Sequence, residues 1–243
     1  MNLFMHNCKV GLFGLLETKV KRHNAQVTLV YEFNDQALRR ELWKQLMGMY
    51  GIIQWAWAVI GDFNCVLNRD ERIGSPISLS EIRESKHCVQ VCSLNDLRSS
   101  GAFYTWNNKL GDISRVYNKI NRVLVDSDWI TTLPSSEAHF GNEGLMDHRP
   151  VIINWGNGQQ PNQCRFKNFN MWSQAPNFQP AVEFLAGKEV LLVKKELDEC
   201  QNKLHKDPKN LQLIEYERRL IEEYQKWKLA ETNNSDRNAR SNG

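Results

Sequence analysis

The sequence predicts an α/β domain of alternating strands and helices, followed by a helical extension. Short β-branched and aromatic runs alternate with segments of helical periodicity as far as Trp155, as in a layered α/β fold. The composition turns polar near residue 156, and apolar residues recur at helical spacing from about 180 onward. Of the 243 residues, 41% are hydrophobic and 24% are charged, so we expect a globular protein.

The first half of the domain alternates the two element types. Apolar, β-branched and aromatic runs predict buried strands, and apolar residues three and four apart predict amphipathic helices. In chain order these are strand 10–17, strand 25–33, helix 36–49, strand 54–64 and helix 79–92. Asn34 and Asp35 stand where the first helix needs an N-cap.

The second half of the domain reads mainly as strands. Gly101 predicts a turn, and a strand follows it through Thr105. The segment 115–126 alternates apolar and polar residues and predicts one further strand. The segment 144–155 predicts a loop that leads into a last strand.

The chain divides by composition into four parts. They are a domain over 1–156, a polar linker over 157–180, a helical segment over 181–231 and a disordered tail over 232–243. The helical segment breaks at "KDPKN" (206–210), where Asp207 is a candidate cap and Pro208 a candidate first helical residue.

Apolar residues recur with near-heptad spacing along one side of the last helix, at Leu213, Leu220, Tyr224 and Trp227. Two antiparallel helices would fit this stripe, and so would one long helix docked on something absent. A helical interaction module is therefore one alternative for the function of this part of the chain.

Charge and cysteine content limit the classes of protein. A net charge of +3 permits a nucleic-acid partner without requiring one. The six cysteines are scattered, with no CxxC pair, so we expect reduced thiols inside the cell, in the nucleus or cytoplasm, and no secretion. No window approaches the roughly 18 apolar residues of a membrane span. Cys88 and Cys92 are spaced for a metal on a helix, but packing on a buried face is the simpler interpretation.

Polar side chains follow the apolar strands at five places. These are Glu17, Tyr31 with Asn34, Asp62 with Asn64, Asn121, and Asp147 with His148. In layered α/β folds, sites are built at the carboxyl ends of strands. Carboxylate and carboxamide oxygens are ligands for Mg²⁺ or Mn²⁺, and histidine supplies a hydrogen-bond donor for phosphate. Taken alone, "GDFN" (61–64) is more often a turn.

Six motifs occur in a family order: "LLETK" (15–19), "VYEFN" (30–34), "GDFN" (61–64), "YTWNN" (104–108), "KINRVLV" (119–125) and "MDHRP" (146–150). In this order they resemble the endonuclease/exonuclease/phosphatase (DNase I-like) superfamily. The likeness is greatest to the endonuclease region of plant LINE-type non-LTR retrotransposon proteins. It extends into 157–231, which resembles the connector to reverse transcriptase.

The resemblance implies a fold of two packed β-sheets flanked by helices, DNA as partner and Mg²⁺ or Mn²⁺ as cofactor, with no small-molecule cofactor. It makes Glu17 the principal metal ligand, with Asp147 serving the metal or the leaving group. Tyr31 would contact the phosphate, Asp62 would orient or deprotonate the attacking water, and Asn64 would hold the phosphate or Asp62. His148 would stabilise charge in the transition state, with residue 121 as its partner. Thr105, Asn34 and Lys19 would lie on the DNA side.

The sequence departs from the family pattern in three ways. The chain starts after the family's first strand, which carries an Asn near the metal. Only 13 residues separate Glu17 from Tyr31, so part of one sheet is expected to be deleted. Asn121 stands where the family has Asp, and it has no charge to stabilise an imidazolium; a comparable change in a serine-protease triad costs roughly 10⁴ in rate. We therefore expect a degenerate phosphodiester-hydrolysing domain with weak or no activity, or a folded non-catalytic remnant.

Overall fold

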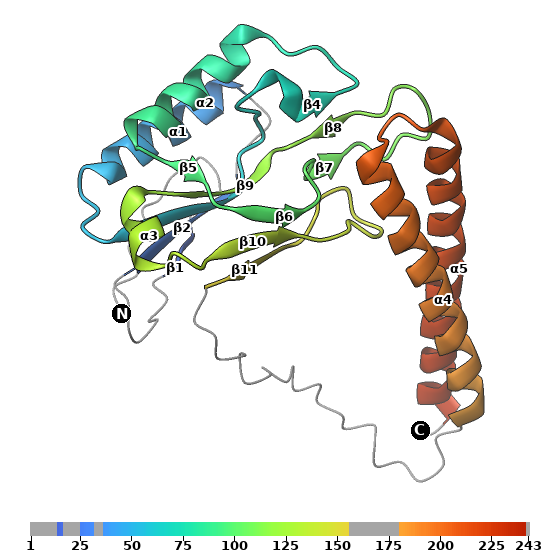
Figure 1. The fold of residues 1–243 in the computed structure, drawn as a ribbon. Coiled ribbons are helices and arrows are strands. Elements are labelled where there is room, and N and C mark those ends of the chain that lie inside the picture. The colour runs from blue at the N-terminus through green and yellow to red at the C-terminus, as the bar shows by residue number, and fades with distance from the viewer. Residues whose placement is uncertain (1–13, 17–24, 32–35, 156–179, 242–243) are drawn as a thin grey trace. The chain divides into compact units, whose positions relative to one another are not determined.

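The computed structural model describes residues 14–16, 25–31, 36–155 and 180–241 (Figure 1). The chain divides into two compact units, Met1–Gly156 and Asn157–Gly243. The first unit is a mixed α/β domain with several sheets, and the second is helical. The segment expected to be a linker, 157–180, lies almost wholly outside the described residues.

The largest sheet of the first unit has five strands in the order β1-β2-β3-β9-β5. Their bounds are Gly14–Leu16 (β1), Ala25–Tyr31 (β2), Ala56–Asp62 (β3), Asn95–Asp96 (β5) and Asn121–Val125 (β9). β2 and β3 are parallel, whereas β9 runs antiparallel to both of its neighbours. β1 runs antiparallel to β2 and pairs Leu16 with Val27.

A second sheet packs against one face of the first. It has the order β11-β10-β6, with bounds Ser99–Gly101 (β6), Glu137–Phe140 (β10) and Val151–Asn154 (β11). Alternate residues of β2, β3 and β9 meet β10 in a buried core, among them Val27, Ala58, Val123, Ala138 and Phe140. This arrangement is the expected pair of packed sheets, and its hydrophobic core fixes which face of β3 and β9 looks inward.

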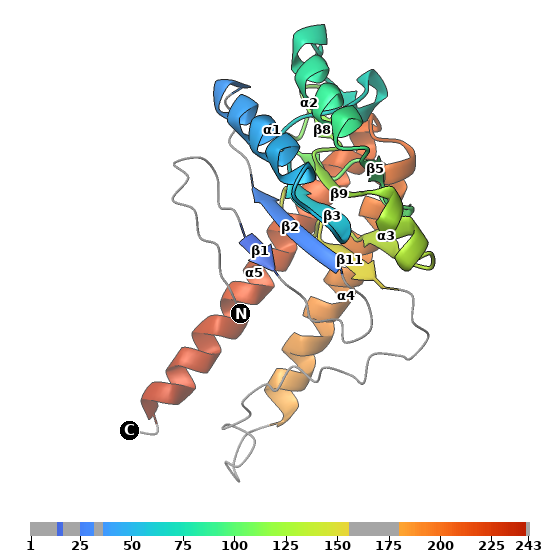
Figure 2. The same ribbon diagram turned by 90° about the vertical axis from the view of Figure 1, so that its left-hand side faces the viewer.

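Two helices cover the other face of the five-stranded sheet (Figure 2). They are α1 (Gln36–Tyr50) and α2 (Leu79–Val91), which match the predicted helices at 36–49 and 79–92. Leu42, Trp43 and Leu46 of α1 pack on Trp57 and Val59 of β3. Cys65, Cys88 and Cys92 are buried in the same core, so Cys88 and Cys92 act there as small apolar residues.

The expected single strand over 115–126 is in fact two strands. β8 (Tyr117–Asn118) belongs to a third sheet, of order β4-β8-β7, with β4 at Arg72–Ile73 and β7 at Trp106–Asn107. β9 begins only at Asn121. Between them, the amide of Lys119 donates to the carbonyl of Glu71 at 2.9 Å, and the amide of Ile120 donates to the hydroxyl of Thr105 at 3.0 Å. Partners distant in sequence therefore break a strand that is continuous by periodicity.

A short helix, α3 (Ser127–Thr132), follows β9 and was not predicted from the sequence. Asp126 caps it, since its carboxylate accepts from the amide of Trp129 at 2.7 Å and also from the amide of Trp57 at 3.1 Å. Trp129 is completely buried between α3 and the inter-sheet core. Asp126 therefore fixes both the helix start and the end of β9 against β3.

The second unit is a hairpin of two antiparallel helices, α4 (Pro180–Lys206) and α5 (Leu211–Ser241). Buried Gln201 donates to Glu217 at 2.9 Å, and Tyr216 donates to Glu196 at 3.1 Å. Leu220, from the near-heptad stripe, is buried, so this residue of the stripe does not face solvent. The sequence allowed either two antiparallel helices or one long helix docked elsewhere, and the structure has the two helices.

Two details of the hairpin differ from expectation. The cap of α5 is Asn210, whose side chain accepts from the amide of Leu213 at 3.2 Å, while Asp207 accepts from the Asn210 side chain at 3.0 Å. α5 also continues to Ser241, across most of the segment 232–243 that was expected to be disordered. Extending a formed helix adds one hydrogen bond per residue without a new nucleation cost, which composition does not report. Among the described helices, none is both long and apolar enough to cross a membrane.

Candidate functional site

Three expected site residues form a row across neighbouring strands of the five-stranded sheet. Tyr31 of β2 pairs with Asp62 of β3, and Asp62 pairs with Asn121 of β9. All three fall on the strand positions that face the second sheet, because side chains alternate along a strand. Tyr31 is 64% exposed, whereas Asp62 is only 5% exposed, so the row runs from solvent to a nearly buried carboxylate.

The turn after β3 holds Asp62 and Asn64 together. Gly61 has φ of 146°, and a Cβ there would lie 1.8 Å from the carbonyl oxygen of Val30. Asn64 has φ of 47°, a left-handed conformation that Asn tolerates better than most residues. Its amide donates to Oδ1 of Asp62 at 3.0 Å, and its side chain donates to Oδ2 at 3.3 Å. "GDFN" is therefore a turn, and it also fixes a carboxylate at the sheet edge.

His148 reaches Asp62 and Asn121 from a separate loop. Its Nδ1 lies 3.0 Å from Oδ1 of Asn121, and its Nε2 lies 4.0 Å from Oδ2 of Asp62. A carboxamide oxygen only accepts hydrogen bonds, so Nδ1 carries the proton and Nε2 faces Asp62. The His148 side chain is 37% exposed, so a ligand can reach the ring. The structure thus brings Asp62, Asn64, Asn121 and His148 together, as the sequence motifs suggested.

The His148 loop is fixed to the segment 105–107 by backbone hydrogen bonds. The amide of Asn107 donates to the carbonyl of Asp147 at 3.1 Å, and the amide of Arg149 donates to the carbonyl of Thr105 at 2.9 Å. These two bonds flank a β-bridge between Trp106 and His148. The position of the imidazole is therefore set by main-chain pairing rather than by its own side-chain contacts.

Thr105, which the resemblance placed on the DNA side, lies in the interior of the first unit. It is completely buried. Its hydroxyl accepts from the amides of Ile120 at 3.0 Å and Asn121 at 2.9 Å. These amides lie just before and at the start of β9, where they lack strand partners, so Thr105 satisfies them internally. Its role is to place Asn121 beneath His148.

Trp106 is a site residue that sequence reasoning missed, because tryptophans in an apolar pattern read as core. Its indole Nε1 donates to Oδ2 of Asp147 at 3.1 Å. Its ring meets the His148 ring edge to face, with centroids 6.4 Å apart. Trp106 therefore orients the exposed Asp147 carboxylate and one side of His148. The spacing within "YTWNN" gave no signal for either contact.

A buried ion pair supports the loop from below. Arg149 and Glu143 are joined at 2.7 Å, and both side chains are only 2% exposed. Asn107 donates to Glu143 at 3.0 Å, and Lys109 lies 3.3 Å from the same carboxylate. Glu143 thus gathers partners from both sides of the loop that carries Asp147 and His148. A pair this buried costs much more when one partner is removed than it contributes as a whole.

The pKa of Asp62 is raised above the usual aspartate value of 3.8, chiefly because burial disfavours the charged carboxylate. The backbone hydrogen bond from Asn64 and the charge of His148 oppose this shift, while the charge of Asp147 adds to it. A carboxylate with a raised pKa is a stronger base once ionised. Asp62 is therefore suited to accept a proton from a water molecule held near His148.

The described residues do not by themselves provide a metal site. No group of three or more His, Cys, Asp or Glu side chains within the described ranges could hold an ion. Glu17, the implied principal ligand, lies outside those ranges, as do Asn34 and Lys19. The acidic side chains described near the edge are Asp62 and Asp147.

No family model matches the sequence, and no curated protein matches it. Among solved structures, the chain is similar to the 3′ phosphatase NExo from Neisseria bound to a product DNA hairpin, at 19% identity and a TM-score of 0.43, covering 59% of this chain and 69% of that one. It is similar to beta toxin from Staphylococcus aureus at 14% identity and a TM-score of 0.40, covering 58% of this chain and 55% of that one. It is also similar to the endonuclease domain of TRAS1, a telomere-specific non-LTR retrotransposon, at 18% identity and a TM-score of 0.40, covering 55% of this chain and 59% of that one.

Proposed function

We propose that the first unit is a phosphodiester hydrolase domain of retrotransposon-endonuclease origin, with DNA as substrate and with weak or no activity in this chain. The observation that carries the proposal is the convergence of Asp62 and His148 within 4.0 Å, with Asn64 and Asn121 each holding one of them. The order of the six sequence motifs supports the family origin.

Asp62 would act as the general base. Its carboxylate would take a proton from water as the water oxygen attacks the phosphorus. The bond from phosphorus to the leaving sugar oxygen would break, and that oxygen would take a proton from solvent water. Protonated His148 would donate from Nε2 to a non-bridging phosphate oxygen, on which negative charge develops. Asn64 keeps Asp62 in place through the hydrogen bonds at 3.0 and 3.3 Å. Tyr31, exposed at the end of the row, would contact the phosphate.

Asn121 would limit the reaction. Its Oδ1 accepts from Nδ1 of His148 and so orients the ring. However, a carboxamide carries no net charge, so it stabilises the imidazolium much less than a carboxylate would. The geometry for hydrolysis would be kept, while the electrostatics would be weakened.

A divalent ion, Mg²⁺ or Mn²⁺, belongs to the proposal through the resemblance alone, with Glu17 and Asp147 as its ligands. The described residues do not form a complete ligand set, so no step above depends on the ion. Its chemistry would be to stabilise charge on the phosphate oxygens. Titrating Mg²⁺ into the EDTA-treated protein during an activity assay tests this part separately.

The test of the proposal is nicking of supercoiled plasmid DNA. The purified chain, His148→Ala and Asn121→Asp would each be incubated with plasmid and Mg²⁺. We expect slow nicking or none by the natural sequence, none by His148→Ala, and clear nicking by Asn121→Asp. No nicking by Asn121→Asp would contradict the proposed hydrolytic site. Equally fast nicking by the natural sequence and Asn121→Asp would contradict the impairment.

A further inference from the structure

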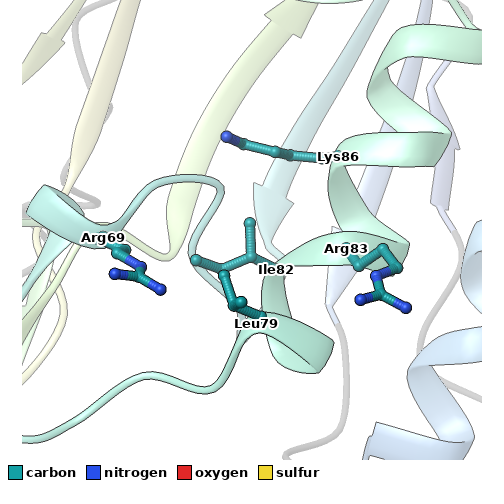
Figure 3. A pocket seen from close by; sticks show the side chains of 5 residues that line it. All are labelled: Arg69, Leu79, Ile82, Arg83 and Lys86. Atoms are coloured by element: carbon teal, nitrogen blue, oxygen red, sulfur yellow. The ribbon is translucent and has the colours of Figure 1, made fainter.

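A depression of about 330 Å³ lies on the first unit, and its lining residues do not include Asp62, Asn64, Asn121 or His148. It is lined by Leu79 and Ile82 of α2, with three cationic residues, Arg69, Arg83 and Lys86. In Figure 3, Leu79 and Ile82 lie between Arg69, which comes from the 3₁₀ helix Arg69–Glu71, and Arg83. Ile82 is buried, whereas Leu79 is 60% exposed, so the depression has an apolar surface open to a ligand.

The three cations are free of acidic partners within the described part of the chain, and all three are exposed. Other cations of the same helix pair behave differently, since Arg40 of α1 binds Glu84 of α2 at 2.9 Å. Three like charges around one small apolar surface repel one another and attract an anion. The depression is therefore suited to a ligand with negative charge and a small apolar part.

A small buried cluster joins the depression to the candidate active site. Ile82 packs with Val66 and Ile120, and Trp106 is partly buried against the same cluster. Ile120 directly precedes Asn121, and Trp106 holds Asp147. Ile82, which lines the depression, and Trp106, which holds Asp147, thus pack against the same buried cluster, so the depression lies near the candidate active site.

We propose that this depression binds the sugar–phosphate backbone of the DNA strand that flanks the bond placed at Asp62 and His148; this rests on the proposed function. Arg69, Arg83 and Lys86 contact backbone phosphate oxygens, and Leu79 contacts the sugar. A volume of about 330 Å³ is at the small end of ligand sites, which fits one backbone unit rather than a base pair. Recognition of this kind positions a strand without reading its sequence.

The test measures DNA affinity without catalysis. The full chain, in EDTA, is titrated against a short fluorescein-labelled DNA duplex, and anisotropy is followed at several salt concentrations. The test variant combines Arg69→Gln, Arg83→Gln and Lys86→Gln. The matched control combines Lys194→Gln, Lys195→Gln and Lys203→Gln, three exposed lysines of α4 with the same charge change. Thermal melts establish whether both variants fold. If the triple test variant does not fold, the single variant Lys86→Glu replaces it in the titration.

The test variant is expected to lose roughly tenfold or more in affinity, and its salt slope should fall by about 0.9 for each phosphate contact removed. The control should change much less in both quantities. Equal losses in the two variants, or no loss in either, would overturn the proposal. A third outcome would also overturn it. If a labelled oligoglutamate peptide binds through these three residues and DNA does not, the depression binds an acidic protein partner.

The design separates this inference from the proposed function. The anisotropy measurement in EDTA does not involve hydrolysis, so it reports the contribution of Arg69, Arg83 and Lys86 separately from the nicking assay. If affinity depends on the three cations but Asn121→Asp does not nick plasmid, only the hydrolytic proposal fails. If Asn121→Asp nicks plasmid and affinity is independent of Arg69, Arg83 and Lys86, only the inference about the depression fails.

Discussion

His148 and Asp62 come from separate segments of the first unit, yet Nε2 of His148 lies 4.0 Å from Oδ2 of Asp62. The local backbone fixes each side chain. Asp62 is fixed by the turn that Gly61 and Asn64 form, and His148 is fixed by backbone pairing with the segment that holds Trp106. The separation leaves room for a water molecule or a phosphate oxygen to contact both groups.

Asn121→Asp is expected to increase nicking. The new carboxylate would accept the same hydrogen bond from Nδ1 of His148 and would add a negative charge beside the imidazole. The carboxylate would stabilise the positive charge of the imidazolium in the transition state, and the gain should approach the order of 10²-fold that acid–base groups contribute. The measurement is the plasmid nicking rate of the variant against that of the natural sequence. Asn202→Asp, an exposed change on α4, is the control and should have no effect.

Asp62→Asn is expected to abolish any nicking and to change the pH dependence of stability. Folding raises the pKa of Asp62 above 3.8, so the folded state binds a proton more tightly than the unfolded state. The contribution of Asp62 to wild-type stability therefore falls as pH rises from about 3.8 through the raised pKa, and is constant above it. The carboxamide that replaces the carboxylate does not ionise, so the variant avoids this loss.

Thermal melts in EDTA across that pH range check the second part. The melting temperature of Asp62→Asn relative to wild type should increase with pH and then level off. A difference that is constant with pH, or that decreases, would show that the carboxylate is not destabilised by burial. Asp112→Asn, on an exposed loop, is the matched comparison, since it makes the same chemical change outside the core.

Arg149→Met is expected to unfold the His148 loop and weaken the whole domain. The change leaves the Glu143 carboxylate buried without its closest charge, a loss of about 3–5 kcal/mol in unfolding free energy. Urea denaturation measures the loss directly. Arg219→Met removes an exposed arginine that pairs with Glu215 in α5 at 2.7 Å, and it should leave stability unchanged. Similar effects from both substitutions would refute the importance of burial for the Arg149 pair.

Gly61→Ala is expected to disrupt β3 just before Asp62. The added Cβ would lie 1.8 Å from the carbonyl oxygen of Val30, and φ of 146° disfavours any other residue. We expect a loss of at least about 2 kcal/mol, since strained backbone positions alone cost on the order of 1–3 kcal/mol. Gly48→Ala in α1 is a suitable control, because a Cβ there meets nothing within 4 Å and alanine favours helix. Comparable destabilisation by the two changes would contradict the close approach of β2 and β3 at Gly61.

The sequence by itself determined the long elements and several site residues. Periodicity predicted β2, β3, α1 and α2, because the burial of one face repeats at fixed spacing along the chain. The motif order singled out Asp62, Asn64, Asn121 and His148, which the structure brings to one edge. These signals are local, since each lies within a few consecutive residues.

Only the tertiary structure decided which distant groups meet. The register that places Tyr31, Asp62 and Asn121 in one row depends on pairing between strands far apart in the chain. The burial of Thr105 follows from the two amides at the start of β9 that need its hydroxyl. The bond from Trp106 to Asp147 likewise joins separate loops. A residue's own pattern reports whether it tends to be buried, but its hydrogen-bond partner is chosen by packing, so the partners of Thr105 and Trp106 could not be read from the sequence.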